Sequence, residues 1–203
     1  MDSHPNGVLY CRLMEYIKWR IEAVLRTLTM VKAQQHYLDN RLAAEFCLLQ
    51  LRVCCELLAI GCIAIHTDVP QTKVLQRMWN ADAIMTRFEK LKPEFFPFPV
   101  RSEKGEDGTF VQHEVVDALT KSELTKMYNF FGSLLHTGTF ELYAKPKVRT
   151  YDFSLIEDFV SKLIRLLNDH TYQLHDGKTM VRIIMHNEKD GHVWINVLQR
   201  RPI

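Results

Sequence analysis

The sequence predicts a mainly α fold, a helical bundle of about five helices with a small C-terminal β-hairpin. The bundle is indicated by a long apolar run at residues 46–66 and by apolar residues that recur every three or four positions in the flanking segments. The hairpin is indicated by residues 179–186 and 192–199, which favour strands and enclose a turn with Gly191.

The length of 203 residues fits one domain with a small extension. We assign residues 1–175 to the bundle, which carries a Pro- and Phe-rich insert at about 92–119. Residues 176–203 form the hairpin, which we expect to pack on the bundle.

The first two helices are expected at residues 8–30 and from a cap at Asp39 or Asn40 to about His66. A single apolar stripe marks the first of them, formed by Leu13, Ile17, Ile21, Val24 and Leu28. The second is apolar almost all round, as is typical of the central helix of a core.

Two charges interrupt the apolar run. Arg52 and Glu56 lie four residues apart, so on a helix they share one face and can pair. A charge in the middle of a bilayer is costly, and we therefore expect a core helix and no membrane span.

The third helix is expected to begin at Asp68 as a cap, with Pro70 in its first turn, and to reach Phe88. Residues 92–101 cannot be helical, because three prolines remove donors and enforce extended backbone. Their phenylalanines are expected to pin this segment to the bundle, and residues 109–113 to form a short strand or an extended arm.

Two matches to the capping box begin the fourth and fifth helices, Thr120–Glu123 and Ser154–Glu157. We expect the fourth helix to end near His136, with Gly138 in a left-handed conformation, and the fifth to end near His170.

The composition excludes several classes of protein. With 26 basic and 24 acidic residues, the net charge of +2 is too balanced to indicate a broad nucleic-acid or anionic-membrane surface. The start of the chain shows no signal-peptide pattern. Four of the five cysteines fall in one predicted helix, where they cannot form a disulfide framework, so we expect reduced thiols and a cytoplasmic protein.

No cofactor is expected. The nine histidines include no HExxH or His-x-His pattern, there is no CxxC pair, and no glycine loop suited to phosphates is present. His186 and His192 are the only pair that strand pairing would bring close, and we predict no metal site.

The candidate binding residues are polar groups near the core: Arg52, Glu56, Tyr128, Asn129 and His136. A buried ion pair needs a partner network or a ligand. It either lines the floor of a polar pocket or ties helices together through Tyr128 or a backbone carbonyl. His136 either caps the end of its helix or lines a cleft with Tyr128 and Asn129, where it could transfer protons.

Two stretches, FCLLQLRVCCELLAIGCIAIHTD and MYNFFGSLLHTGTF, resemble a group of uncharacterised bacterial proteins with a HEPN-like helical bundle. The resemblance covers about residues 8–170. It implies a binding or interaction module that pairs as a homodimer and recognises RNA or a nucleotide, in bacterial stress or anti-phage defence.

Active members of that family use an arginine and a histidine separated by four to six residues in a metal-independent ribonuclease site. The chain contains one literal match, Arg165 and His170, which become the candidate catalytic pair, with His136 as the alternative histidine of the cleft. About two such matches are expected by chance at this composition, and the usual polar residue after the arginine is replaced by Leu166. Three interpretations therefore stay open: a non-catalytic module, a ribonuclease and a purely structural protein.

Overall fold

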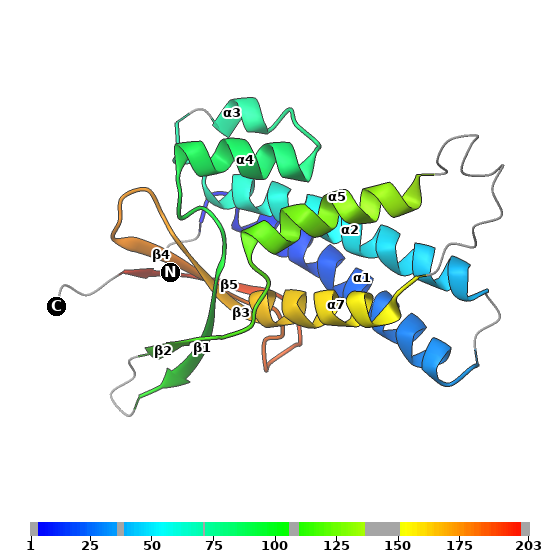
Figure 1. The fold of residues 1–203 in the computed structure, drawn as a ribbon. Coiled ribbons are helices and arrows are strands. Elements are labelled where there is room, and N and C mark those ends of the chain that lie inside the picture. The colour runs from blue at the N-terminus through cyan, green and yellow to red at the C-terminus, as the bar shows by residue number, and fades with distance from the viewer. Residues whose placement is uncertain (1–3, 36–38, 71, 106–109, 137–150, 200–203) are drawn as a thin grey trace.

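The fold is α+β, so the prediction of a mainly α bundle is wrong. The computed structural model describes residues 4–35, 39–70, 72–105, 110–136 and 151–199. In these residues a layer of helices packs on a five-stranded antiparallel sheet (Figure 1). The helices are α1 (Gly7–Lys32), α2 (Asn40–Ile65), α3 (Thr72–Leu75), α4 (Ala81–Leu91), α5 (Lys121–Leu135) and α7 (Phe153–Leu167). The strands are β1 (Phe98–Lys104), β2 (Phe110–Glu114), β3 (Asp169–Gln173), β4 (Thr179–Ile184) and β5 (Trp194–Gln199).

The apolar run forms α2, the centre of the helical layer. It packs against α1, α4, α5 and α7. Asp39 caps it by accepting from the backbone N–H of Arg41 at 2.7 Å, which confirms the expected start. By length and composition alone α2 could also cross a bilayer, but most of its apolar stretch is buried inside the protein. The absence of a membrane span and the cytoplasmic location stay predictions.

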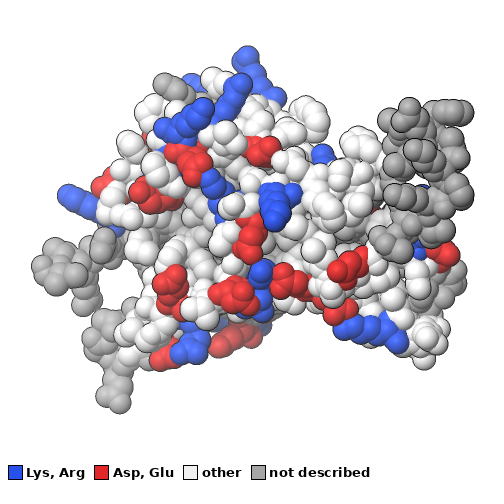
Figure 2. Space-filling model, viewed as in Figure 1, with Lys and Arg blue, Asp and Glu red and all other residues white. Residues whose placement is uncertain are grey.

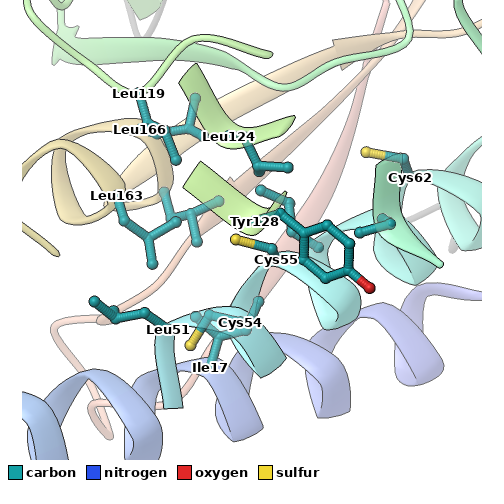
Figure 3. Packing of buried hydrophobic residues seen from close by; sticks show 14 of the residues in the cluster. Ile17, Leu51, Cys54, Cys55, Cys62, Leu119, Leu124, Tyr128, Leu163 and Leu166 are labelled. Atoms are coloured by element: carbon teal, nitrogen blue, oxygen red, sulfur yellow. The ribbon is translucent and has the colours of Figure 1, made fainter. Parts of the chain in front are cut away.

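Four cysteines of α2 contribute to the core as small apolar groups. Cys54 and Cys55 lie among Ile17, Leu51 and Leu163 (Figure 3). All five cysteines are free thiols. Burial raises the pKa of Cys54 and of Cys62 to about 12, so both thiols stay protonated and unreactive at neutral pH.

Helix ends follow their capping residues, with two corrections to the predicted starts. Thr120 and Glu123 form both reciprocal bonds of the capping box that begins α5. The second predicted box does not form, because Asp152 caps α7 by accepting from the N–H of Ser154 at 2.9 Å. The predicted third helix is two helices, since Asn80 caps α4 through the N–H of Ala83. Gly138 lies outside the described residues.

The predicted hairpin is present as β4 and β5, but it is only part of a larger sheet. The strand order is β2-β1-β3-β4-β5. The Pro-rich segment supplies β1, where Phe98 pairs with Thr171 of β3. α7 ends at Leu167, so His170 belongs to β3 and not to a helix. The sheet therefore crosses the expected domain boundary at residue 175.

Alternation along the strands gives the sheet two different faces. The inner face presents His170, Tyr172, Val181 and Ile183, all fully or almost fully buried. The outer face presents the alternate residues, among them Asp169, Thr171 and Arg182 of β3 and β4 and Trp194 of β5. The homodimer expected on the second face of the hairpin stays a prediction.

Candidate functional site

The first candidate site joins α2 to α5. Arg52 donates from Nη1 to the main-chain oxygen of Tyr128 at 3.1 Å and from Nη2 to the Tyr128 hydroxyl at 2.9 Å. Its guanidinium carbon lies 4.0 Å from the centroid of the Tyr128 ring, a cation–π contact. The hydroxyl donates in turn to Glu56 at 3.2 Å, and Glu56 lies 3.6 Å from Nε of Arg52. Three of the five expected binding residues thus come together.

These contacts describe a bridge between helices. Both terminal nitrogens of Arg52 already donate to Tyr128, and its Nε faces Glu56. Burial raises the pKa of Tyr128, so the hydroxyl stays protonated and continues to donate to Glu56. The arginine is thus held by protein groups, as the helix-tying alternative requires.

A glycine makes room for the arginine. A Cβ atom built at Gly132 would overlap Nη1 of Arg52, well inside van der Waals contact. Glycine in the interior of a helix is otherwise unfavourable relative to alanine. The glycine at this position of α5 is therefore explained by the close approach of the guanidinium.

Gly132→Ala is expected to destabilise the protein by about 1–2 kcal/mol, although the same change in an unobstructed helix stabilises by up to about 1 kcal/mol. The loss comes from displacing Arg52 from its two bonds to Tyr128. Urea unfolding of a double-mutant cycle with Arg52→Met measures it. In the Arg52→Met background Gly132→Ala should become neutral or stabilising. An equal effect in both backgrounds would show that the glycine does not serve the arginine.

The other two expected binding residues do not join this cluster. Asn129 donates to Asp82 of α4 at 3.1 Å on the surface. His136 is exposed at the end of α5, eight residues beyond Tyr128 and therefore ~12 Å along the helix axis. The expected cleft with His136 beside Tyr128 does not form.

The candidate catalytic histidine lies in the core. His170 is fully buried, and its Nδ1 lies 2.8 Å from the main-chain oxygen of Leu167 and therefore carries the proton. Its Nε2 then accepts from the Tyr10 hydroxyl at 2.7 Å, and Tyr10 lies 3.0 Å from the hydroxyl of Tyr172. This chain satisfies both ring nitrogens and leaves none for a substrate.

The candidate catalytic arginine is on the surface. Arg165 donates from Nε to the main-chain oxygen of Asp117 at 2.7 Å and from Nη2 to its carboxylate at 2.9 Å. Because Arg165 faces outward and His170 faces the core, the structure does not bring the predicted pair together. The spacing in the sequence suits a continuous helix, but the chain becomes a strand after Leu167.

A second site, which the sequence analysis missed, surrounds Arg165. A groove of about 1230 Å³ opens between the C-terminal end of α7 and the strands β1, β3, β4 and β5. Four cationic and two acidic side chains line it: Arg101, Arg165, Arg182, Lys189, Asp169 and Glu188. Acidic and basic side chains are interspersed on the face shown in Figure 2. The three arginines of the groove are each paired with a carboxylate, Arg101 with Glu103, Arg165 with Asp117 and Arg182 with Asp169. Lys189 is the cation of the groove that has no ion pair within the described residues.

Aromatic side chains accompany these cations on the outer face of the sheet. Trp194 lines the groove and is 37% exposed. Phe98 is 50% exposed and belongs to the same face, because the register runs from Phe98 through Thr171 and Arg182 to Asn196. The alternation along residues 193–198 signals a second apolar face in the sequence. The groove itself has no such signal, because its residues come from five separate segments.

Metal chemistry has no support in the described residues, where no group of three His, Cys, Asp or Glu side chains is placed to hold an ion. Comparisons with protein-family models, with curated proteins and with solved structures found no match to this chain.

Proposed function

We propose that the protein is a non-catalytic binding module that recognises single-stranded RNA in the groove beside α7. The observation that carries this proposal is the presence of cations and an exposed tryptophan in one groove on the outer face of the sheet. Positive charge that follows a backbone, together with aromatic rings that stack on bases, is the usual basis of single-strand binding. The HEPN-like resemblance is proposed for the helical layer alone.

The cations of the groove are suited to phosphates. Arg165 and Arg101 engage Asp117 and Glu103 in exposed ion pairs, which contribute little to stability. Phosphate oxygens can therefore replace these carboxylates at small cost, and Arg165 keeps the planar guanidinium that binds phosphate through two nitrogens. Lys189 adds an exposed charge at the turn after β4.

The ribonuclease alternative loses its proton-transferring group. His170 is sealed in the core, and burial lowers its pKa to about 4, so it is neutral at physiological pH. Arg165 can bind a phosphate but cannot remove a proton from a ribose hydroxyl. His136 lies at the end of α5, which does not line the groove. His186 does line it, but has no hydrogen bond within the described residues that would orient its ring as a general base. We therefore propose binding without cleavage.

Fluorescence anisotropy with a short labelled single-stranded RNA tests the proposal. Trp194→Ala is expected to weaken binding at least about fivefold through loss of stacking. Lys189→Ala should lower the affinity and also reduce the salt dependence, which for three phosphate contacts is a slope of about −2 in log–log form.

Matched controls are available on other elements. Trp79 is 72% exposed and lies outside the groove, so Trp79→Ala should leave the affinity unchanged. Lys126→Ala is the control for Lys189→Ala, because Lys126 is an exposed lysine of α5 outside the groove, and it should also leave the affinity unchanged. Absence of RNA binding at low salt, or equal losses in Trp194→Ala and Trp79→Ala, would refute the proposed function.

A further inference from the structure

A second cavity lies directly beside the groove. It is a cleft of about 230 Å³ between α1 and α7. Its walls are apolar, formed by Ile21, Leu25, Ile164, Leu167 and Met185. Its volume is below that of a pocket for a drug-sized molecule, so it suits a single flat ring system.

The cleft and the groove are continuous around the end of α7. Three residues line both of them, Ile164, Asn168 and His186. Asn168 and His186 are exposed, and within the described residues neither side chain is hydrogen-bonded to another group. The mouth of an apolar cleft thus carries two polar side chains with unused hydrogen-bonding groups, next to the cationic groove.

From this juxtaposition we infer that the cleft takes one unstacked nucleobase of the strand whose phosphates lie in the groove; the inference rests on the proposed function. The apolar walls contact the two faces of the base. Asn168 and His186 at the mouth meet its polar edge, as side chains do when they read bases of single-stranded RNA.

The charged side chains of the groove favour a nucleotide over an apolar side chain of a partner protein as the ligand of the cleft. Arg101 and Arg165 are held only in exposed ion pairs, whose carboxylates phosphate oxygens can replace at small cost. A ligand that spans both cavities must therefore combine a neutral flat group with a neighbouring anionic group. A nucleotide has this arrangement.

Two charged residues also line the cleft, Lys18 and Glu22. Lys18 does not select an anion there, since its Nζ already donates to the main-chain oxygen of Gly191 at 2.6 Å and contacts Glu15, and Glu22 faces Arg26.

The test uses a set of short single-stranded RNAs, each lacking the base at a different position. We expect one position whose base removal weakens binding to the wild-type protein at least about fivefold. Leu25→Trp fills the cleft with its indole ring. It should weaken binding of the intact RNA by a similar factor and abolish the difference between intact and abasic strands.

Leu9→Trp is the matched control, because Leu9 is 43% exposed and Leu25 is 40% exposed on the same helix, and Leu9 lies outside both cavities. It should leave binding unchanged. His186→Ala, a surface change that does not threaten folding, should weaken the intact strand and spare the abasic one.

The outcomes separate the two proposals. If no RNA binds, both the proposed function and this inference fail. If RNA binds, but all abasic strands and Leu25→Trp behave like the intact strand and the wild type, only the base-binding cleft is overturned. Equal losses in Leu25→Trp and Leu9→Trp overturn it as well.

Discussion

Acidification from about pH 7 to about pH 5 is expected to lower the free energy of unfolding by about 4 kcal/mol, through two buried histidines that contribute about 2 kcal/mol each. Burial lowers the pKa of His66 and of His170 from 6.5 to about 4. Between these values the unfolded chain binds protons that the folded protein excludes. The stabilisation is therefore complete above pH 6.5 and is lost as the pH falls towards 4.

The surroundings of each histidine oppose protonation. A proton on Nε2 of His170 would face the hydroxyl hydrogen of Tyr10. His66 lies 3.0 Å from the main-chain oxygen of Phe95 through Nε2, and its Nδ1 has no hydrogen-bond partner among the described residues. The His66 ring packs edge-on against Phe88 and Tyr172, so a positive charge there would be poorly solvated.

Urea unfolding of wild type, His170→Gln and His175→Gln at both pH values measures the effect. His170→Gln should remove about 2 kcal/mol of the difference between the two pH values. His66 and His4, whose pKa burial also lowers, should account for the remainder. His175→Gln, which changes an exposed residue, should retain the whole difference.

Protonation of carboxylates contributes little to the change in the free energy of unfolding between pH 7 and pH 5. Even Glu123, whose pKa is held at about 2 mainly by the backbone N–H of Thr120, is charged in both states at that pH. A drop in His170→Gln equal to that of wild type would show that the buried histidine does not cause it.

The helices could be predicted because their signals are local. The apolar periodicity of α1 and α2 and the capping residues Asp39 and Thr120 act within one or two turns, and each leads to the observed start or face. The capping box predicted at Ser154 does not form, and the reason is again local. Asp152 lies two residues earlier and supplies a competing oxygen.

The sheet could not be predicted because its strands are defined by their partners. β1 contains Pro99 and an exposed Phe98, and it is a strand only because β2 and β3 flank it. His170 continues the helical spacing of Leu163 and Leu167, yet it is drawn into β3 by pairing with Ile183. Context of this kind overrides local propensity.

The two candidate sites also differ in how far local patterns predict them. Arg52 and Glu56 follow from their four-residue spacing on one helix, and the bridge that they form with Tyr128 is one of the two alternatives that the sequence allows. The groove needs Arg101, Arg165 and Trp194 to meet across three elements. Such a meeting depends on the strand order, which no local pattern encodes.

Arg182→Met is expected to destabilise the protein by about 3–5 kcal/mol, because it leaves the carboxylate of Asp169 without its partner. Arg182 donates to Asp169 from Nε at 3.0 Å and from Nη2 at 2.7 Å. Both side chains are largely buried on the outer face of the sheet, at 8% and 13% exposed. A carboxylate left there without a counter-charge is far more costly than one at the surface.

Two further variants separate burial from charge. Arg165→Met breaks an ion pair with Asp117 of similar geometry on the surface, and it should change the free energy of unfolding by less than about 1 kcal/mol. Asp169→Leu combined with Arg182→Met removes both buried charges and should recover most of the loss, because paired apolar groups of similar size replace buried ion pairs at little cost. Urea unfolding at neutral pH measures all four proteins. If Arg182→Met and Arg165→Met are equally mild, then water reaches Asp169 and the floor of the groove is not the dry, rigid platform that base stacking beside Trp194 requires.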